Sequence, residues 1–371
     1  MIIGIPKEIK NHEYRVGMTP AGAELLVTAG HTVYVQNTAG EGTGIGDDEY
    51  TSIGAKILPT AKEVFDTAEM IIKIKEPLEP EFPMIREDQV LFTYLHLAGD
   101  ENLTKKILET GVVGIGYETM EMEDGSLPLL VPMSEVAGRL AIVEGAKYVQ
   151  RTFGGRGIFL GGVPGTEPAK VVVLGAGIVG KHAAQMALGL GAQVTIMTRN
   201  VNRLRELDQA YLGRLKTLKM TPWNIREAIK TADVVVGSVL VTGAKAPWVI
   251  TRDMLKTMRK GAVIVDVSID QGGCCETSRP TTHAEPIYEV DGIIHYCVAN
   301  MPGCVPRTST YALTNETMPY ALEIADKGWR RACKENRMLR TGLNVCMGKL
   351  CYKPVADEFN IPYTPAEEFL G

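Results

Sequence analysis

Residues 170–200, KVVVLGAGIVGKHAAQMALGLGAQVTIMTRN, decide the fold of this chain. The apolar run Val171–Leu174 predicts a buried strand, which leads into the pattern Gly175-x-Gly177-x-x-Gly180, a small-residue helix and a second strand. In such a unit the first glycine allows a tight turn, the second lets a pyrophosphate approach the backbone, and the third lets helix and strand pack closely. The N–H groups at the helix start then face the phosphates. The unit therefore predicts a dinucleotide site, and the alternative is a glycine-rich helix start without a ligand.

The end of the second strand is where such a fold distinguishes NAD from NADP. An acid there accepts hydrogen bonds from the adenosine ribose of NAD, whereas a cation suits the 2′-phosphate of NADP. This chain has Thr198, Arg199 and, a little further on, Arg203. A guanidinium can donate two hydrogen bonds to a phosphate, so these residues favour acceptance of NADP. In the alternative, Arg199 points to solvent and Thr198 bonds the ribose hydroxyls.

Outside this unit, short β-rich apolar runs alternate with helical patterns along most of the chain. This alternation predicts an α/β fold with two Rossmann-like, doubly wound parallel-sheet domains and a cleft between them. Thr19 as N-cap, Pro20 at the first helical position and Gly30 as the stop predict one of the helices. The predicted strands are 2–5, 32–35, 70–74, 90–95, 112–115, 171–174, 193–197, 233–236, 262–267 and 294–298.

The pattern also predicts where the domains divide. A join is expected near residues 125–150, and the glycine-rich segment 154–165 is expected to be a turn-rich connection, because no Gly-Lys-Ser/Thr follows it as in a phosphate-binding loop. From Tyr311 to Cys333 the pattern is helical, and a polar tail follows. The predicted division is a substrate domain of residues 1–128 plus 306–371 and a dinucleotide-binding domain of residues 129–305.

Composition limits the classes of partner. The chain has 371 residues, 22% of them charged, and a formal net charge of -5, which gives no electrostatic reason to expect nucleic acid or an anionic membrane. No signal peptide or apolar run of membrane-spanning length is visible. Seven cysteines without zinc-type spacing indicate reduced thiols in a cytoplasm and no metal site, and the adjacent Cys274 and Cys275 receive no role.

Three residues follow predicted strands at the edge where parallel α/β sheets gather their ligands: Lys75, His96 and Asp270. A lysine can hold a substrate carboxylate, a histidine can transfer protons, and an aspartate can stabilise a positive amine. Taken singly, each has a structural alternative: a solvated strand-end charge, a hydrogen-bonded histidine, and a turn residue before two glycines.

Longer motifs carry a family resemblance. The stretches GIPKEIKNHEYRVGMTPAG, IIKIKEP, YLHLA, VPMSEVAGRLA, DQGGCCETSRPTTH and VANMPGCVPRTSTYALTN resemble the alanine dehydrogenase family over essentially the whole chain. Several motifs are shared with the α subunit of proton-translocating transhydrogenase, which is the alternative. That relative is expected to engage a membrane partner and to need no substrate residues, so the presence of Lys75 and His96 favours the dehydrogenase.

The resemblance implies roles for individual residues. Arg15 and Lys75 are expected to bind the carboxylate of pyruvate or alanine, and His96 and Asp270 to carry the acid–base work. Motif and resemblance together predict cofactor contacts at Ser134, Gly175, Gly177, Ile178, Val179, Gly180, Thr198, Arg199, Arg203, Asn300 and Met301. Family members usually keep an acid at the position of Thr198, so the family's use of NAD is the feature that this sequence calls into question.

The function that the resemblance implies is reversible oxidative deamination of L-alanine to pyruvate and ammonia, with NAD as the family's cofactor and acceptance of NADP predicted from Thr198 and Arg199. The alternative is a dinucleotide-binding subunit related to transhydrogenase α. The family also implies a homo-oligomer, a hexamer, in the cytoplasm, whose first domain is completed by the C-terminal helices.

Overall fold

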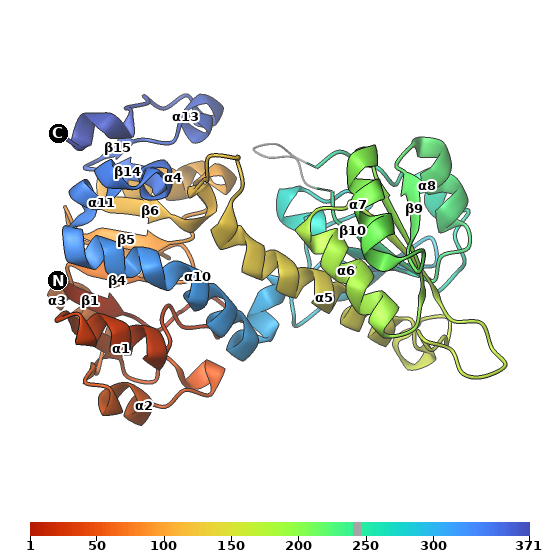
Figure 1. The fold of residues 1–371 in the computed structure, drawn as a ribbon, viewed down its shortest axis with the longest axis horizontal. Helices are drawn as coiled ribbons and strands as arrows, with labels where there is room; N and C mark the ends of the chain where they lie inside the picture. Colours follow the sequence, from red (N-terminus) through yellow and green to blue (C-terminus); the bar gives the residue numbers. More distant parts are fainter. Residues whose placement is uncertain (240–245) are drawn as a thin grey trace. The chain divides into compact units, whose positions relative to one another are not determined.

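The computed structural model describes residues 1–239 and 246–371 (Figure 1). The chain forms two compact units, one of Met1–Met133 with Gly303–Gly371 and one of Ser134–Pro302. Helix α5, Val131–Tyr148, runs across the first boundary between them. The described part of the chain thus divides at 133/134 and 302/303, where the sequence suggested 128/129 and 305/306.

The first unit is built on an eight-stranded sheet in the order β15-β14-β6-β5-β4-β1-β2-β3. Strands β1 to β6 are parallel, in the doubly wound order 3-2-1-4-5-6, and the C-terminal strands β14 and β15 extend the sheet in antiparallel fashion. The strands are β1 Ile2–Ile5, β2 Thr32–Gln36, β3 Lys56–Leu58, β4 Met70–Ile72, β5 Val90–Thr93, β6 Val113–Gly116, β14 Leu343–Cys346 and β15 Lys349–Leu350.

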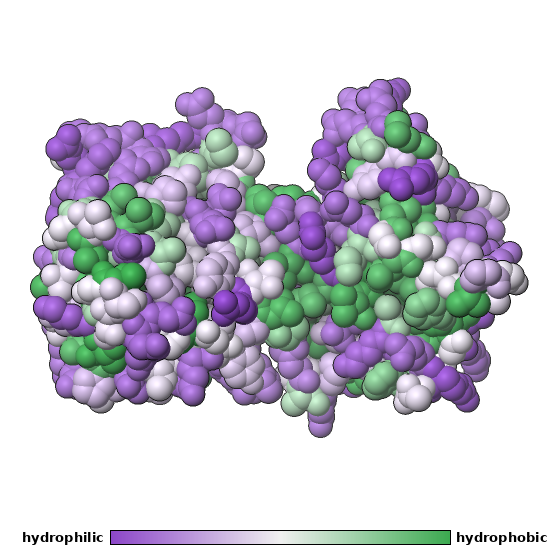
Figure 2. Space-filling model, turned by 60° about the horizontal axis from the view of Figure 1, so that its bottom comes forward, coloured by the Kyte–Doolittle hydropathy of each residue, from purple (hydrophilic) through white to green (hydrophobic). Residues whose placement is uncertain are grey.

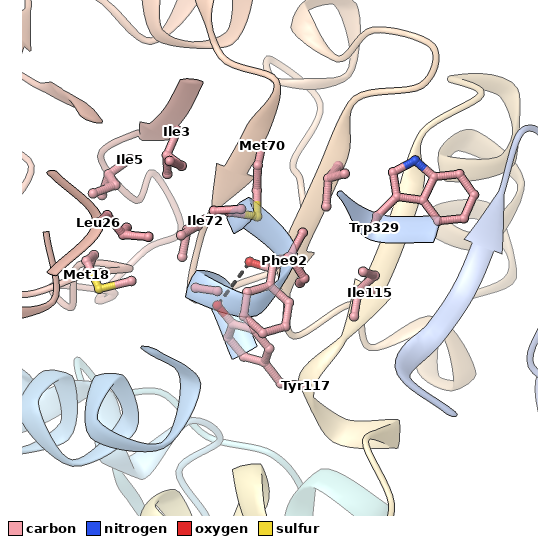
Figure 3. Close-up of a cluster of buried hydrophobic side chains, with 14 of the residues drawn as sticks. Ile3, Ile5, Met18, Leu26, Met70, Ile72, Phe92, Ile115, Tyr117 and Trp329 are labelled. Atoms are coloured by element: carbon pink, nitrogen blue, oxygen red, sulfur yellow. Dashed lines mark hydrogen bonds between the residues drawn. The ribbon is translucent and has the colours of Figure 1, made fainter. Parts of the chain in front are cut away.

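Helices cover both faces of this sheet because its strands are apolar on both sides. Met70, Phe92 and Ile115 contribute to one buried cluster, which Figure 3 shows with Tyr117 and Trp329. Ile71 and Leu91, which alternate with them, belong to the cluster on the other face. The helices are α1 Pro20–Thr28, α2 Asp47–Ser52, α3 Ala61–Thr67, α4 Glu101–Glu109, α10 Pro306–Lys327, α11 Trp329–Glu335, α12 Arg337–Gly342 and α13 Lys353–Phe359.

The second unit repeats the same topology in a seven-stranded sheet of order β12-β13-β11-β10-β7-β8-β9, in which only β12 is antiparallel. Alternate residues of β7 again enter different clusters, Val171 and Val173 on one face and Val172 and Leu174 on the other. The strands are β7 Lys170–Leu174, β8 Gln193–Thr198, β9 Lys216–Lys219, β10 Val234–Gly237, β11 Val263–Asp266, β12 Ile287–Val290 and β13 Ile293–Tyr296. The helices are α6 Ile178–Gly189, α7 Val201–Tyr211, α8 Pro222–Ile229 and α9 Arg252–Leu255.

The α/β class with two Rossmann-like sheets is confirmed. So is the predicted helix start, since the Thr19 side chain accepts a hydrogen bond from Gly22 N at 3.3 Å and Pro20 is the first residue of α1. Residues 154–165 form turns without a helix or strand, as expected. The C-terminal segment belongs to the first unit, and it contains strands that the sequence did not predict, since β14 is buried along its length and pairs with β6.

No helix in the described part of the chain combines the length and apolar character that a bilayer span requires. Polar side chains cover much of the face shown in Figure 2, with apolar areas interspersed over both units. All seven cysteines are free thiols, and Cys274 and Cys275 are buried.

Candidate functional site

In the first unit, the loops that follow β1, β4 and β5 bring three predicted residues to one edge of the sheet. Arg15 lies in the loop after β1, Lys75 follows β4 by three residues, and His96 follows β5 by three residues. Strands β1 and β4 are adjacent, but the strand that follows β1 in the sequence, β2, lies on one side of this pair, and the strand that follows β4, β5, lies on the other. The carboxyl ends of β1 and β4 therefore form the topological switch point of the sheet. Ligands of open α/β sheets bind at this point.

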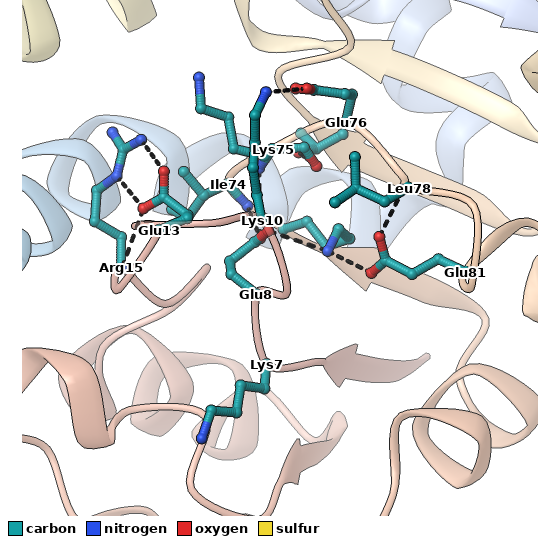
Figure 4. Close-up of polar contacts among 12 residues, drawn as sticks. Lys7, Glu8, Lys10, Glu13, Arg15, Ile74, Lys75, Glu76, Leu78 and Glu81 are labelled. Atoms are coloured by element: carbon teal, nitrogen blue, oxygen red, sulfur yellow. Dashed lines mark hydrogen bonds and ion pairs between the residues drawn. The ribbon is translucent and has the colours of Figure 1, made fainter. Parts of the chain in front are cut away.

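Arg15 is buried and paired with an acid that the sequence did not single out. Its Nε donates to Glu13 Oε1 at 2.6 Å and its Nη2 to Glu13 Oε2 at 2.5 Å, so the pair is bidentate (Figure 4). Burial opposes the charge on the guanidinium, but the hydrogen bonds that it donates to Glu13 and the charge of that carboxylate more than offset burial and raise the pKa of Arg15. Nη1 of Arg15 lies 2.9 Å from the sulfur of Met133.

Lys75 and its neighbour Lys73 have different surroundings. Lys73 is fully buried, and its ammonium lies 3.1 Å from Glu8 Oε2 and 2.6 Å from Glu81 Oε1. Glu8 Oε1 also accepts the backbone N–H of Ile74 at 2.6 Å, which ties the strand end to the loop after β1 (Figure 4). By contrast, the Lys75 ammonium makes no ion pair or hydrogen bond within residues 1–239 and 246–371. Burial and then the charge of Arg15 lower the pKa of Lys75.

His96 is held by the carboxylate that directly follows Lys75. Its Nδ1 lies 2.9 Å from Glu76 Oε2, and Glu76 Oε1 forms an ion pair with Lys10 (Figure 4). Burial would raise the pKa of Glu76, but the contacts with His96 and Lys10 outweigh it and lower that pKa. An ionised Glu76 can only accept at this contact, which favours the tautomer with a proton on Nδ1 and leaves Nε2 to act on a ligand.

The backbone of His96 adopts a left-handed conformation, with φ 52°. Such a conformation costs a non-glycine residue about 1–3 kcal/mol and is concentrated at functional sites. The carboxylate of Glu118 holds this turn, since its Oε1 accepts the N–H groups of Leu95 at 3.0 Å and His96 at 2.6 Å.

In the second unit, the glycine loop lies at the equivalent edge, after β7. Gly175 has φ +111°, and a Cβ there would lie 2.2 Å from the carbonyl oxygen of Ser238, the residue after β10. A Cβ on Gly180 would lie 2.0 Å from the carbonyl oxygen of Gly175. Protein contacts therefore require both glycines, whereas a Cβ on Gly177 would meet nothing within 4 Å.

The start of α6 fits a pyrophosphate. Gly177 is its N-cap and has no side chain to cap the first N–H groups, which include those of Ile178 and Val179. A Cβ on Gly177 would meet no protein atom within 4 Å, so the side of the loop that this Cβ would occupy is open, and N–H groups at a helix start are typical phosphate donors. The loop thus has both the donors and the room for a dinucleotide.

At the end of β8, the three predicted side chains differ in their contacts. Thr198 is the last residue of the strand, and its hydroxyl accepts the N–H of Asn200 at 3.3 Å. Arg199 is exposed and makes no hydrogen bond or ion pair with the described residues. Arg203 is already engaged, because its Nε donates to the Ala176 carbonyl at 3.2 Å and its Nη1 pairs with Glu206 at 2.7 Å.

Asp270 does not follow its strand directly, which corrects the sequence interpretation. Strand β11 ends at Asp266, and Asp270 is an exposed residue of the 3-10 turn Val267–Gln271. Asp266 is the buried strand-end acid. Its Oδ2 accepts the N–H of Cys274 at 2.8 Å and the hydroxyl of Ser278 at 2.6 Å, which fixes the loop that carries Asp270.

Three further predicted contacts lie at the same edge or near the glycine loop. Asn300 and Met301 follow β13, and Asn300 has φ 60°. Ser134 lies on α5 one turn before Gly138, whose Cβ position is 2.3 Å from the carbonyl oxygen of Val179. The face of α5 that carries Ser134 therefore packs toward the start of α6.

Sequence reasoning missed the acids that hold the first-unit residues: Glu13, Glu76 and Glu118. Glu76 could have been found, because it adjoins Lys75 in the sequence. Glu118 follows β6 and reaches His96 only through the pairing of β5 with β6. Ser238, which contacts the glycine loop through its hydroxyl at 2.9 Å from Leu174 O, was also missed.

Comparisons with known proteins show which family the chain resembles. The family models described as "Alanine dehydrogenase/PNT, N-terminal domain" and "Alanine dehydrogenase/PNT, C-terminal domain" match residues 4–137 and 141–353. Alanine dehydrogenases of Methanococcus maripaludis and Mycolicibacterium smegmatis are 57% and 52% identical to this chain, each over 100% of both chains.

Solved structures show the same fold. An L-alanine dehydrogenase, 48% identical, superposes with a TM-score of 0.95 over 97% of this chain and 99% of its own. A transhydrogenase from Sinorhizobium meliloti, 24% identical, has a TM-score of 0.81 over 95% of this chain and 99% of its own, which is a likeness of fold. Family models match both halves of the sequence, and relatives match it over their full length. This chain therefore belongs to the alanine dehydrogenase/PNT family.

Proposed function

We propose that this chain is an alanine dehydrogenase that catalyses the reversible, NAD-dependent oxidative deamination of L-alanine to pyruvate and ammonia. Full-length identity of 50–57% to alanine dehydrogenases supports this function. The observation that carries it is the group at the switch point of the first sheet, where two cations lie beside a histidine–carboxylate pair. A small carboxylic acid with a group to be deprotonated fits this set of side chains.

Arg15 and Lys75 bind the substrate carboxylate in this proposal. Glu13 fixes the orientation of the guanidinium, so that little side-chain freedom is lost when the substrate binds. The Lys75 ammonium, which has no partner among the described residues, supplies the second cation. Together they hold Cα in one orientation, which is catalysis by positioning.

His96 carries the acid–base work. Loss of hydride from Cα leaves a positive iminium, which Asp270 stabilises. His96 Nε2 accepts a proton from the water that adds to the iminium carbon and returns it to the nitrogen of the carbinolamine. As ammonia leaves and the carbonyl of pyruvate forms, His96 Nε2 takes the proton of the carbinolamine hydroxyl, so that one proton remains on the histidine. The Nδ1–H directed at Glu76 keeps Nε2 available for both transfers.

The second unit holds the cofactor. Bound NAD supplies the acceptor for the hydride that leaves Cα. The glycine loop from Gly175 to Gly180, with Ile178 and Val179, would receive the pyrophosphate, because its glycines leave room and the start of α6 has uncapped N–H groups. Ser134 would lie near the pyrophosphate. Asn300 and Met301 contact the nicotinamide.

We further propose that Thr198 and Arg199 allow NADP to bind. No carboxylate ends β8 to repel a 2′-phosphate, and the unpaired guanidinium of Arg199 provides two donors to it. Arg203 contributes less in this proposal, because Glu206 and Ala176 already engage it. A hexamer and a cytoplasmic location stay predictions from the sequence.

The test of both proposals is kcat/KM for reductive amination of pyruvate with NADH and with NADPH, side by side. NADPH within about tenfold of NADH, a difference of about 1.4 kcal/mol, supports a phosphate contact by Arg199. A thousandfold preference for NADH contradicts it and leaves the dehydrogenase in place. Binding of NADH without any turnover of pyruvate and ammonium would instead favour a dinucleotide-binding subunit.

The role of His96 is tested by His96→Ala. We expect turnover of pyruvate to be lost while the Kd for NADH stays within about twofold, because the histidine and the glycine loop belong to different sheets. Wild-type-like turnover in this variant removes His96 from the mechanism.

A further inference from the structure

Three loops of the first unit meet at one carboxylate. Glu76, after β4, has one oxygen on Lys10, from the loop after β1, and the other at 2.9 Å from His96 Nδ1, after β5. The Glu76 side chain is only 10% exposed, so both contacts are partly shielded from water. The ion pair and hydrogen bond form a linear series, Lys10–Glu76–His96.

We propose that Glu76 is a positioning residue of the reaction: it fixes the tautomer of His96 and stabilises the protonated form of His96 during proton transfer. Lys10, through its ion pair with Glu76, reduces the effect of the Glu76 charge on the imidazole. This inference rests on the proposed dehydrogenase function. It gives Glu76 and Lys10 a role in proton transfer, although neither is expected to touch the substrate.

The proton transfers explain why a carboxylate is needed at this place. When water adds to the iminium, one water proton moves to His96 Nε2 and the ring becomes an imidazolium. The negative charge of Glu76 stabilises that cation, which gives its proton to the nitrogen. The ring becomes an imidazolium again when Nε2 takes the proton of the carbinolamine hydroxyl as ammonia leaves. A glutamine would accept or donate at Nδ1 with equal ease, so it would neither fix the tautomer nor balance the charge.

Other groups that face His96 act differently. Glu118 contacts its backbone N–H, and the ring of Tyr94 lies 5.7 Å from the imidazole centroid. Lys75, next to Glu76, adds a positive charge nearby. Because Glu76 is the carboxylate in contact with the ring nitrogen, its removal has a defined sign: the imidazolium becomes harder to form.

The first experiment compares Glu76→Gln with the wild type in alanine deamination at saturating NAD and alanine. We expect kcat to fall about 10- to 100-fold, as for other residues that orient a reacting histidine. The KM for alanine should not rise, because Arg15 and Lys75 remain. The acid limb of the kcat profile should move to lower pH by about one unit. Glu76→Asp keeps the charge and should restore the position of this limb.

A matched control is Glu79→Gln. Glu79 lies in the same loop, but it is largely exposed and pairs with Lys106 instead of His96. We expect its kcat and its pH profile to match the wild type. Wild-type kcat and pH profile in Glu76→Gln would overturn the proposal.

Lys10→Gln should shift the acid limb of the kcat profile in the direction opposite to Glu76→Gln. General damage to the fold would not produce shifts of opposite direction. Removing the cation leaves more of the Glu76 charge to act on the imidazole, so the acid limb should move to higher pH, by less than in Glu76→Gln because Lys10 is partly exposed. Lys10→Arg should restore the wild-type profile. Shifts of both glutamine variants in the same direction contradict the proposal.

A readout without turnover separates this inference from the proposed function. The chain has six histidines, so ring-labelled histidine gives a tractable NMR spectrum, and His96→Gln assigns the His96 signal. The wild type should show His96 as the Nδ1–H tautomer, and Glu76→Gln should show a mixture and a lower titration midpoint. An identical signal in both proteins overturns the inference, whereas absence of alanine turnover in the wild type bears on the proposed function.

Discussion

Lys73 and Lys75 are two positions apart in the sequence, yet one stabilises the fold and the other faces a ligand in the proposed site. The sequence singled out Lys75 because it follows the predicted strand 70–74, but the motif IIKIKEP contains no sign of what surrounds Lys73, two positions earlier on the same side of an extended chain. The distinction depends on Glu8 and Glu81, which enclose Lys73 from other segments. Burial lowers the pKa of Lys73, but these two carboxylates outweigh it and raise that pKa.

We expect Lys73→Met and Lys75→Met to separate stability from binding. Lys73→Met leaves two buried carboxylates without their cation, so the free energy of unfolding should fall by about 3–5 kcal/mol in urea titrations. Lys75→Met should unfold like the wild type, while its KM for pyruvate rises about 10- to 100-fold through loss of a charged hydrogen bond. A reversed pattern would assign the binding role to Lys73.

The lowered pKa of Lys75 also predicts a pH dependence. An ammonium binds a carboxylate only while it is protonated, and burial together with Arg15 makes Lys75 lose its proton at a lower pH than an ordinary lysine. The KM for pyruvate should therefore rise at a pH below that at which an ordinary lysine, with a pKa of about 10.4, loses its proton. Lys75→Arg, which stays charged at that pH, should remove the rise. A KM that rises equally in both proteins would exclude Lys75 as its cause.

At the scale of elements, the strands that the sequence predicted carry apolar runs and are buried on at least one face, as β4 and β5 are on both and β2 is on one. Strands β3 and β9 were missed because they are short edge strands with partly exposed polar residues, such as Lys56 and Lys216, and show no apolar run. The glycine motif was readable because it is local: strand, turn and helix are consecutive. The turn at His96 was not, since Glu118 holds it from the end of another strand.

The glycine loop offers a test at this scale. Gly177→Ala places a methyl group where no protein atom lies within 4 Å, so the melting temperature without cofactor should match the wild type. The same methyl occupies the space proposed for the pyrophosphate, and the Kd for NAD should rise at least about tenfold, or about 1.4 kcal/mol. Gly180→Ala should instead lower the melting temperature, because its Cβ meets the Gly175 carbonyl at 2.0 Å. Unchanged NAD affinity in Gly177→Ala would place the pyrophosphate elsewhere.

At the scale of the whole molecule, the chain builds the same strand order twice and inserts the second sheet into the sequence of the first. The two α/β series were visible in the sequence as two sets of apolar runs. The return of the C-terminal segment as strands was not, because pairing of β14 with β6 joins residues 343–345 to residues 114–115. Such a long-range pairing leaves no local pattern.

Strand β14 should therefore contribute to the free energy of unfolding as much as a central strand does. Leu343 is 1% exposed, and Leu343→Ala should lower the free energy of unfolding by about 2–5 kcal/mol. Lys349→Ala, on the exposed side of β15, should change it by less than about 0.5 kcal/mol. Urea denaturation monitored by circular dichroism measures both. Equal effects would mean that β14 adds little to the first unit.

The insertion also sets an order of events on the ribosome. Residues 134–302 can form their sheet as soon as they emerge, but β6, made much earlier, keeps an apolar edge without a partner until β14 is translated. At roughly 5–20 residues per second this edge waits for about 10–50 s. During synthesis, the unit that is started first is thus the last to be completed. Until then, the nascent chain must keep the free edge of β6 from pairing with a strand of a neighbouring molecule.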